Sequence, residues 1–76
     1  MVEIELAVGM RIKELREKNR ITQENLAFLS GLDRTYINSV ENGRRNISIV
    51  NIKKISIAFE LSVREFFNSP LFQSWL

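Results

Sequence analysis

The chain has 76 residues, of which 45% are hydrophobic, and its 11 lysines and arginines exceed its 9 aspartates and glutamates by a net charge of +2. This length supports one small domain, and the apolar fraction is that of a folded protein. The absence of cysteine and histidine excludes disulfides, thiol nucleophiles, imidazole bases and the usual zinc ligands. No arrangement of carboxylates suggests acid–base catalysis. We therefore expect no enzyme, no metal and no cofactor.

No apolar run approaches the roughly 20 residues that a membrane span requires. The first residues carry Glu3 and Glu5 in place of the basic start of a signal peptide. We expect a cytoplasmic single domain over residues 1–76, with a core at 9–67 and an apolar C-terminal tail at 69–76. Apolar and acidic residues alternate from Val2 to Leu6, so a short extended arm is an alternative to an early helix there.

A helix-starting pattern recurs along the chain: a polar N-cap with an apolar residue just before it and another four positions after it. The four caps are Thr22, Asp33, Ser48 and Ser62, and we expect a full capping box only at Ser62, with Glu65 reaching back. Glycine and proline are sparse, which favours short helices over strands. The pattern predicts an all-α fold of five helices, over residues 6–18, 22–30, 33–41, 48–59 and 62–68.

The second and third of these helices are separated by a very short turn. Ala27 is small where two helices would cross closely, and Gly31 can adopt the positive φ that ends the first of them. Apolar side chains then lock the pair at a steep angle: Leu26, Leu32, Ile37 and Val40. This spacing predicts a helix-turn-helix, whose second helix enters the major groove of DNA.

The outer face of helix 33–41 is rich in hydrogen-bonding groups and has no free carboxylate. Arginine can bind guanine, and asparagine adenine, through paired hydrogen bonds, while threonine offers a hydroxyl or a methyl group. The base contacts that we expect are Arg34, Thr35, Asn38 and Ser39. The alternative is an ordinary solvated face, which would more often mix glutamate and lysine.

Backbone or groove contacts are expected on either side of this helix. Gln23 stands at a helix N-terminus, where N–H groups favour an anion. Arg44, Arg45 and Asn46 follow the recognition helix, although for Arg44 simple complementation of the helix C-terminus is an equal alternative. Arg20 is expected to be only a solvated charge.

Arg16 and Glu41 both lie near the inward sides of their helices. We expect a partly buried ion pair between them, with a structural role.

Helix 48–59 has two apolar stripes. The stripe expected to face the core contains Ile49, Ile52, Ile55 and Phe59. The second stripe, Val50 and Ile57, lies on a different side of the helix, where a monomer would expose it to water. In the last helix, neighbouring Phe66 and Phe67 diverge by about 100° and cannot both enter one core, and Phe66 is assigned to a contact with Leu61. We therefore expect a homodimer interface formed by Val50, Ile57 and Phe67. Such a dimer would set two recognition helices roughly 34 Å apart and require a palindromic site.

Residues 9–67 resemble the lambda-repressor-like, or XRE-type, helix-turn-helix family in their pattern of Gly9, Ile12, Leu15, Arg16, Thr22-Gln23, Leu26-Ala27, Gly31, Ile37, Glu41 and Gly43. The segment SGLDRTYINSVENGRRNISIVNI (30–52) is most similar to controller proteins of restriction–modification systems. The resemblance implies a compact five-helix domain and homodimers that bind paired palindromic operators, regulating their own gene and an endonuclease gene. It implies base contacts at Arg34 and Thr35, with further base, groove or backbone contacts at Tyr36, Arg45 and Asn46.

The chain departs from the family at Phe28 and Leu29, which are apolar where polar residues are usual, and we expect the N-terminal segment or the tail to cover them. The apolar tail itself lies outside the resemblance, with Leu71, Phe72, Trp75 and Leu76.

A phage-type repressor or the antitoxin of a toxin–antitoxin pair is the alternative within DNA binding. A protein-interaction module is the alternative of another class, against which the lack of free carboxylates on the recognition face argues. No small-molecule effector is evident.

Overall fold

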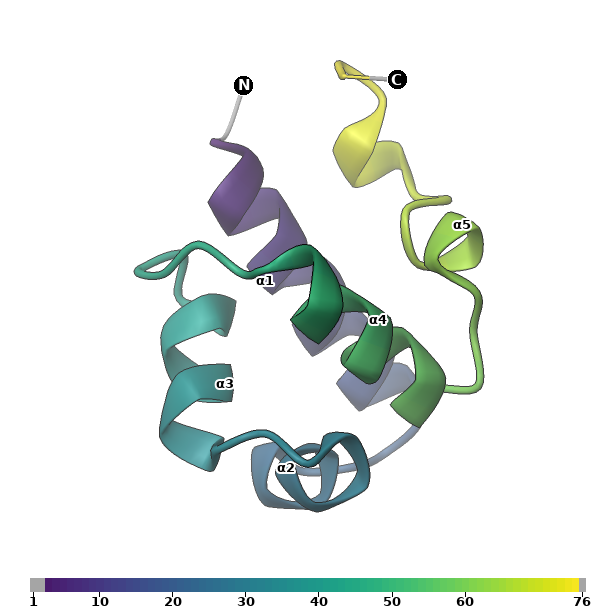
Figure 1. Ribbon diagram of the computed structural model, residues 1–76. Coiled ribbons are helices and arrows are strands. Elements are labelled where there is room, and N and C mark those ends of the chain that lie inside the picture. Colours follow the sequence, from purple (N-terminus) through teal and green to yellow (C-terminus); the bar gives the residue numbers. More distant parts are fainter. Residues whose placement is uncertain (1–2, 76) are drawn as a thin grey trace.

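The computed structural model describes residues 3–75, and within them it contains five α-helices, one 3-10 helix and no strand (Figure 1). In chain order these are α1 (Ile4–Lys18), α2 (Gln23–Ser30), α3 (Arg34–Glu41), α4 (Ile49–Ala58), α5 (Val63–Phe66) and η1 (Pro70–Phe72). The prediction of an all-α fold with five helices is confirmed. Helix α1 already begins at Ile4, so the alternative of an extended arm is wrong for residues 4–6, while Val2 lies outside the described residues.

All four predicted N-caps accept a hydrogen bond from the backbone of the first turn of their helix: Thr22, Asp33, Ser48 and Ser62. The expectation of a single capping box is wrong, because the side-chain oxygen of Asn25 also accepts from the Thr22 N–H, at 3.3 Å. An asparagine amide thus takes the place of the usual glutamate or glutamine. At the other box, the backbone N–H and the hydroxyl of Ser62 lower the pKa of Glu65.

The core lies where the first four helices, α1 to α4, meet the C-terminal segment. Its largest fully buried apolar side chains are Phe66, Phe72, Ile12, Leu26, Ile37, Ile55 and Val40. The tail folds back so that η1 packs on α1, and both ends of the chain lie at the same end of the molecule (Figure 1). Because Phe72 is only 1% exposed, the tail closes the core.

Two expectations about apolar side chains are wrong. Ile49 is expected in the core but is 82% exposed. Each step of three residues falls about 60° short of a full helical turn, so the two steps from Ile49 to Ile55 set these side chains roughly 120° apart around α4. Phe28 and Leu29 are 87% and 54% exposed and therefore uncovered, and the tail packs on α1.

The turn between α2 and α3 holds these helices at the steep angle seen in Figure 1. Gly31 has φ 73° and its N–H donates to the Ala27 carbonyl at 2.9 Å, which ends α2. On the far side of α3, a Cβ at Gly9 would lie 2.2 Å from the Val40 carbonyl oxygen. Helix α1 therefore approaches the end of α3 more closely than any side chain at Gly9 would allow.

Candidate nucleic-acid interface

Helix α3 divides sharply into a buried and an exposed side. Ile37, Val40 and Glu41 are buried, and Glu41 is the only carboxylate within the helix. Of the four predicted base contacts, Arg34, Thr35 and Asn38 are exposed, whereas Ser39 is half-buried. The exposed side of α3 thus presents a guanidinium, a hydroxyl and an amide with no acidic side chain of α3 beside them.

The predicted partners Arg16 and Glu41 form a bidentate ion pair beneath this face. Arg16 Nε lies 2.6 Å from Glu41 Oε2, and Arg16 Nη2 lies 2.9 Å from Glu41 Oε1. Arg16 Nη1 also donates to the Ile21 carbonyl at 3.0 Å, which ties α1 to the start of α2. The hydrogen bond to Glu41 raises the pKa of Arg16. The side chain of Glu41 is only 3% exposed, so the pair is structural and unavailable to DNA.

A chain of side-chain hydrogen bonds joins the ion pair to the recognition face. Gln23 Nε2 donates to Glu41 Oε1 at 3.1 Å, and Asn38 Nδ2 donates to Gln23 Oε1 at 3.2 Å. Gln23, which we expected to contact the DNA backbone, is half-buried and stands at the N-terminus of α2. Its side chain also holds that of Asn38 through the hydrogen bond just described.

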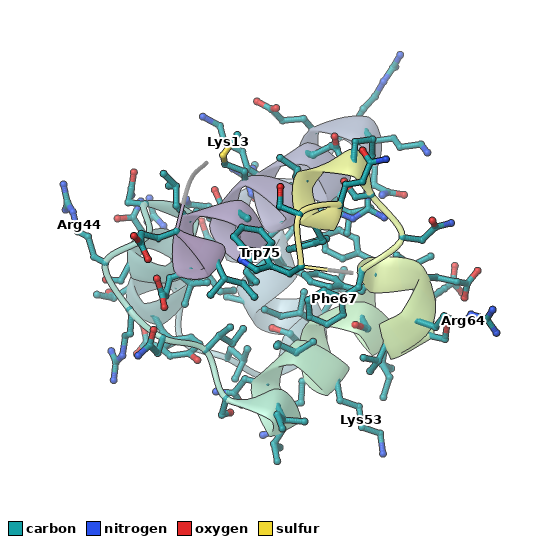
Figure 2. The ribbon with its side chains drawn as sticks, turned by 90° about the horizontal axis from the view of Figure 1, so that it is seen from above. Lys13, Arg44, Lys53, Arg64, Phe67 and Trp75 are labelled. Carbon is teal, nitrogen blue, oxygen red and sulfur yellow. The ribbon has the colours of Figure 1, made fainter. Side chains whose placement is uncertain are left out.

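A second group of side chains lies beside the first turn of α3. The Arg45 guanidinium lies 4.9 Å from the centre of the Tyr36 ring, a cation–π distance. Asn51 Nδ2 donates to the Tyr36 hydroxyl at 3.1 Å. Arg44 and Asn46 are exposed on the same loop, and Arg44 projects away from the body of the molecule (Figure 2).

Two connecting side chains were not anticipated from the sequence. Arg11 of α1 donates to the backbone carbonyls of Phe66 at 2.7 Å and Glu65 at 3.0 Å. It thereby satisfies the C-terminal carbonyls of α5 from a distant part of the chain. Asn51 lies in the first turn of α4, and no spacing in the sequence signals its contact with Tyr36.

The proposed interface residues lie on α4 and α5. Val50 and Ile57 are 63% and 61% exposed, as expected of side chains outside the core. Phe67 is half-buried, because its ring packs edge-on against two others. The centre of its ring lies 5.0 Å from that of Phe66 and 4.9 Å from that of Phe72. Both adjacent aromatics therefore contact the core, which the divergence argument did not allow for. Figure 2 shows Phe67 near the middle of that view.

Residues 3–75 contain no group of three acidic side chains placed to hold a metal ion. Within the same stretch, no helix combines the length and the apolar character needed to cross a membrane.

The steep α2–α3 pair, with its polar outer helix and flanking arginines, defines a helix-turn-helix DNA-binding protein. Comparison with known proteins gives the same class, because residues 12–66 match the family described as Helix-turn-helix. Control protein C.MunI of Mycoplasma sp is 44% identical over 69 residues, which cover 90% of this chain and 93% of that protein.

Two crystal structures are similar to the fold. That of the restriction-modification controller protein C.AhdI from Aeromonas hydrophila has a TM-score of 0.79 at 49% identity, covering 83% of this chain and 96% of that one. That of the C.Esp1396I tetramer in complex with its natural 35 base-pair operator has a TM-score of 0.84 at 36% identity, covering 96% and 95%. The chain belongs to the helix-turn-helix family, within the restriction–modification controller proteins, and is a DNA-binding transcriptional regulator and not an enzyme.

Proposed function

We propose that this protein acts in the cytoplasm as a homodimer on palindromic operators and controls the genes of a restriction–modification system. One observation carries the proposal: the exposed side of α3 presents Arg34, Thr35 and Asn38, while the helix's only carboxylate is buried. Side chains on such a helix in the major groove can read the acceptors and donors of base edges.

In this proposal the contacts divide into two sets. Arg34, Thr35, Asn38 and Ser39 read bases, with Ser39 limited by its half-burial to a peripheral contact. The backbone or groove is bound by Gln23, Tyr36, Arg44, Arg45 and Asn46. The position of these groups on both sides of α3 supports the division, because phosphate contacts fix the register in which a recognition helix reads bases.

The dimer is proposed to form through Val50, Ile57 and Phe67. Exposed apolar side chains on the outer side of α4 support this interface. The C.Esp1396I tetramer bound to a 35 base-pair operator supports a further step, in which two dimers occupy one operator. A two-fold dimer would place its recognition helices about one DNA turn apart.

Replacement of Arg34 by alanine tests the proposal. Duplexes enriched by the wild-type protein from a random library serve as the operator, and a scrambled duplex of the same length serves as competitor. Loss of a bidentate guanine contact should cost about 1–3 kcal/mol on the enriched duplex and relax the preference at one position of each half-site. Arg64→Ala is the control, because Arg64 is exposed on α5 and projects away from the molecule there (Figure 2).

Failure of the wild-type protein to enrich any sequence would contradict the proposed function. An equal loss of affinity on enriched and scrambled duplexes would instead make Arg34 a phosphate contact.

A further inference from the structure

We infer that Asn51 is a positioning residue, which orients the hydroxyl of Tyr36 toward DNA. The inference rests on the proposed function, in which Tyr36 contacts the DNA backbone or groove. Asn51 belongs to α4 and was assigned to no contact, yet its Nδ2 lies 3.1 Å from the Tyr36 hydroxyl oxygen of α3. This hydrogen bond joins the recognition helix to the helix that carries the proposed dimer interface.

The tyrosine is held at two points. At its end, the hydroxyl is bound by Asn51, whose backbone N–H is fixed by the Ser48 hydroxyl at 3.1 Å. At the ring, the Arg45 guanidinium lies 4.9 Å from the ring centre. Tyr36, Arg45 and Asn51 also line one surface hollow together with Asp33 and Thr35 at the start of α3. A side chain ordered before binding loses less conformational entropy when DNA arrives.

The direction of the hydrogen bond decides what Tyr36 offers. A phenol has one hydrogen and accepts through its oxygen, whereas an amide NH2 only donates. Because Asn51 donates to the Tyr36 oxygen, the phenol hydrogen remains free to donate to another group. The phosphate oxygens of DNA are acceptors, so this hydrogen matches them. A hydroxyl that already accepts a hydrogen bond is also polarised toward donating one.

A double-mutant cycle measures this dependence. Asn51→Ala and Tyr36→Phe should each weaken binding to the enriched duplex about three- to tenfold, the range of one hydrogen bond. The double variant should bind no more weakly than Tyr36→Phe alone, because Asn51 acts through the hydroxyl that Tyr36→Phe removes. Losses that multiply in the double variant would overturn the inference, since Asn51 would then bind DNA without Tyr36.

A measurement on the free protein separates this inference from the proposed function. Tyr36 is the only tyrosine in the chain, so the tyrosine doublet in ultraviolet resonance Raman spectra reports on its hydroxyl alone. Asn51→Ala should remove the signature of an accepting phenol, and Asn51→Asp, which only accepts, should replace it with that of a donor. A doublet unchanged in both variants would overturn the inference, whatever the protein binds.

Discussion

The recognition face, formed by the exposed side of α3 and the start of α2, and the outer side of α4 treat their solvent-facing residues in opposite ways. On α2 and α3, Gln23 and Asn38 are bonded to one another and, through Glu41, to a buried ion pair. On α4, exposed apolar side chains stand without such partners: Ile49, Val50 and Ile57, at 82%, 63% and 61% exposure.

The difference shows how similar helices are specialised. Helices α2, α3 and α4 begin with the same kind of polar cap, so their backbones are built alike. Polar groups held in place suit a ligand that is recognised by directed hydrogen bonds, because little order has to be gained on binding. Exposed apolar groups suit a protein surface, because their burial is favourable without precise direction.

Breaking the buried ion pair should have the largest effect and tests whether the α2–α3 side depends on it. Glu41→Ala leaves the Arg16 guanidinium, whose side chain is 13% exposed, without its carboxylate. We expect the free energy of unfolding to fall by about 3–5 kcal/mol in urea denaturation at neutral pH. Small domains have total stabilities of order 5–15 kcal/mol, so this loss would remove a large share of the stability and nearly all of it at the lower end of that range.

Glu14→Ala is the matched control for this variant. Glu14 also pairs with an arginine, Arg11, at 2.6 Å, but its side chain is 52% exposed. Water already screens such a pair, so the expected loss is below about 1 kcal/mol. Equal losses in the two variants would show that burial does not distinguish the two ion pairs.

A charge on the outer side of α4 tests whether this surface forms the proposed dimer interface. Ile57→Glu places a carboxylate in the proposed interface while sparing the buried core, because Ile57 is 61% exposed. We expect a folded monomer in sedimentation and a strong reduction of operator binding, since one recognition helix then binds alone.

Met10→Glu is the control, because Met10 is likewise apolar and 41% exposed, but lies on α1. It should leave the oligomeric state unchanged. A dimeric Ile57→Glu protein would move the interface elsewhere, for example to the tail around Trp75.

Local rules of the chain predicted most of the fold. Each cap with its two apolar neighbours depends on residues within a few positions, and so helix starts could be read directly from Thr22, Asp33, Ser48 and Ser62. The role of Ile49 was misjudged because a stripe of three-residue steps drifts around a helix, and its edge residue leaves the core.

Contacts between distant parts of the chain were harder to predict. The Arg16–Glu41 pair was foreseen because both residues carry charge close to an inward face. Arg11 and Asn51 bind partners that lie 55 and 15 residues away, and an arginine or asparagine on a helix surface gives no sign of such a partner. The tail belongs to the core because η1 packs on α1 and Phe72 is buried near Phe66, and the periodicity of the sequence cannot show such a contact.

The smallest expected effect concerns how the helices end. The recognition helix is bracketed by glycines in the left-handed region, Gly31 at φ 73° and Gly43 at φ 69°, whereas α4 is followed by Glu60 at φ 59°. An L-residue pays about 1–2 kcal/mol for this conformation, while glycine loses about 0.5–1 kcal/mol more backbone entropy on folding. Glu60→Gly should therefore stabilise the fold by up to about 1.5 kcal/mol, and each kcal/mol raises Tm by roughly 4–8 °C. Lys54→Gly, in the exposed middle of α4, should instead lower Tm, because glycine there costs about 1 kcal/mol. If Glu60→Gly and Lys54→Gly both lowered Tm, the prediction would be wrong. Contacts of the Glu60 side chain would then offset the strain of its left-handed backbone.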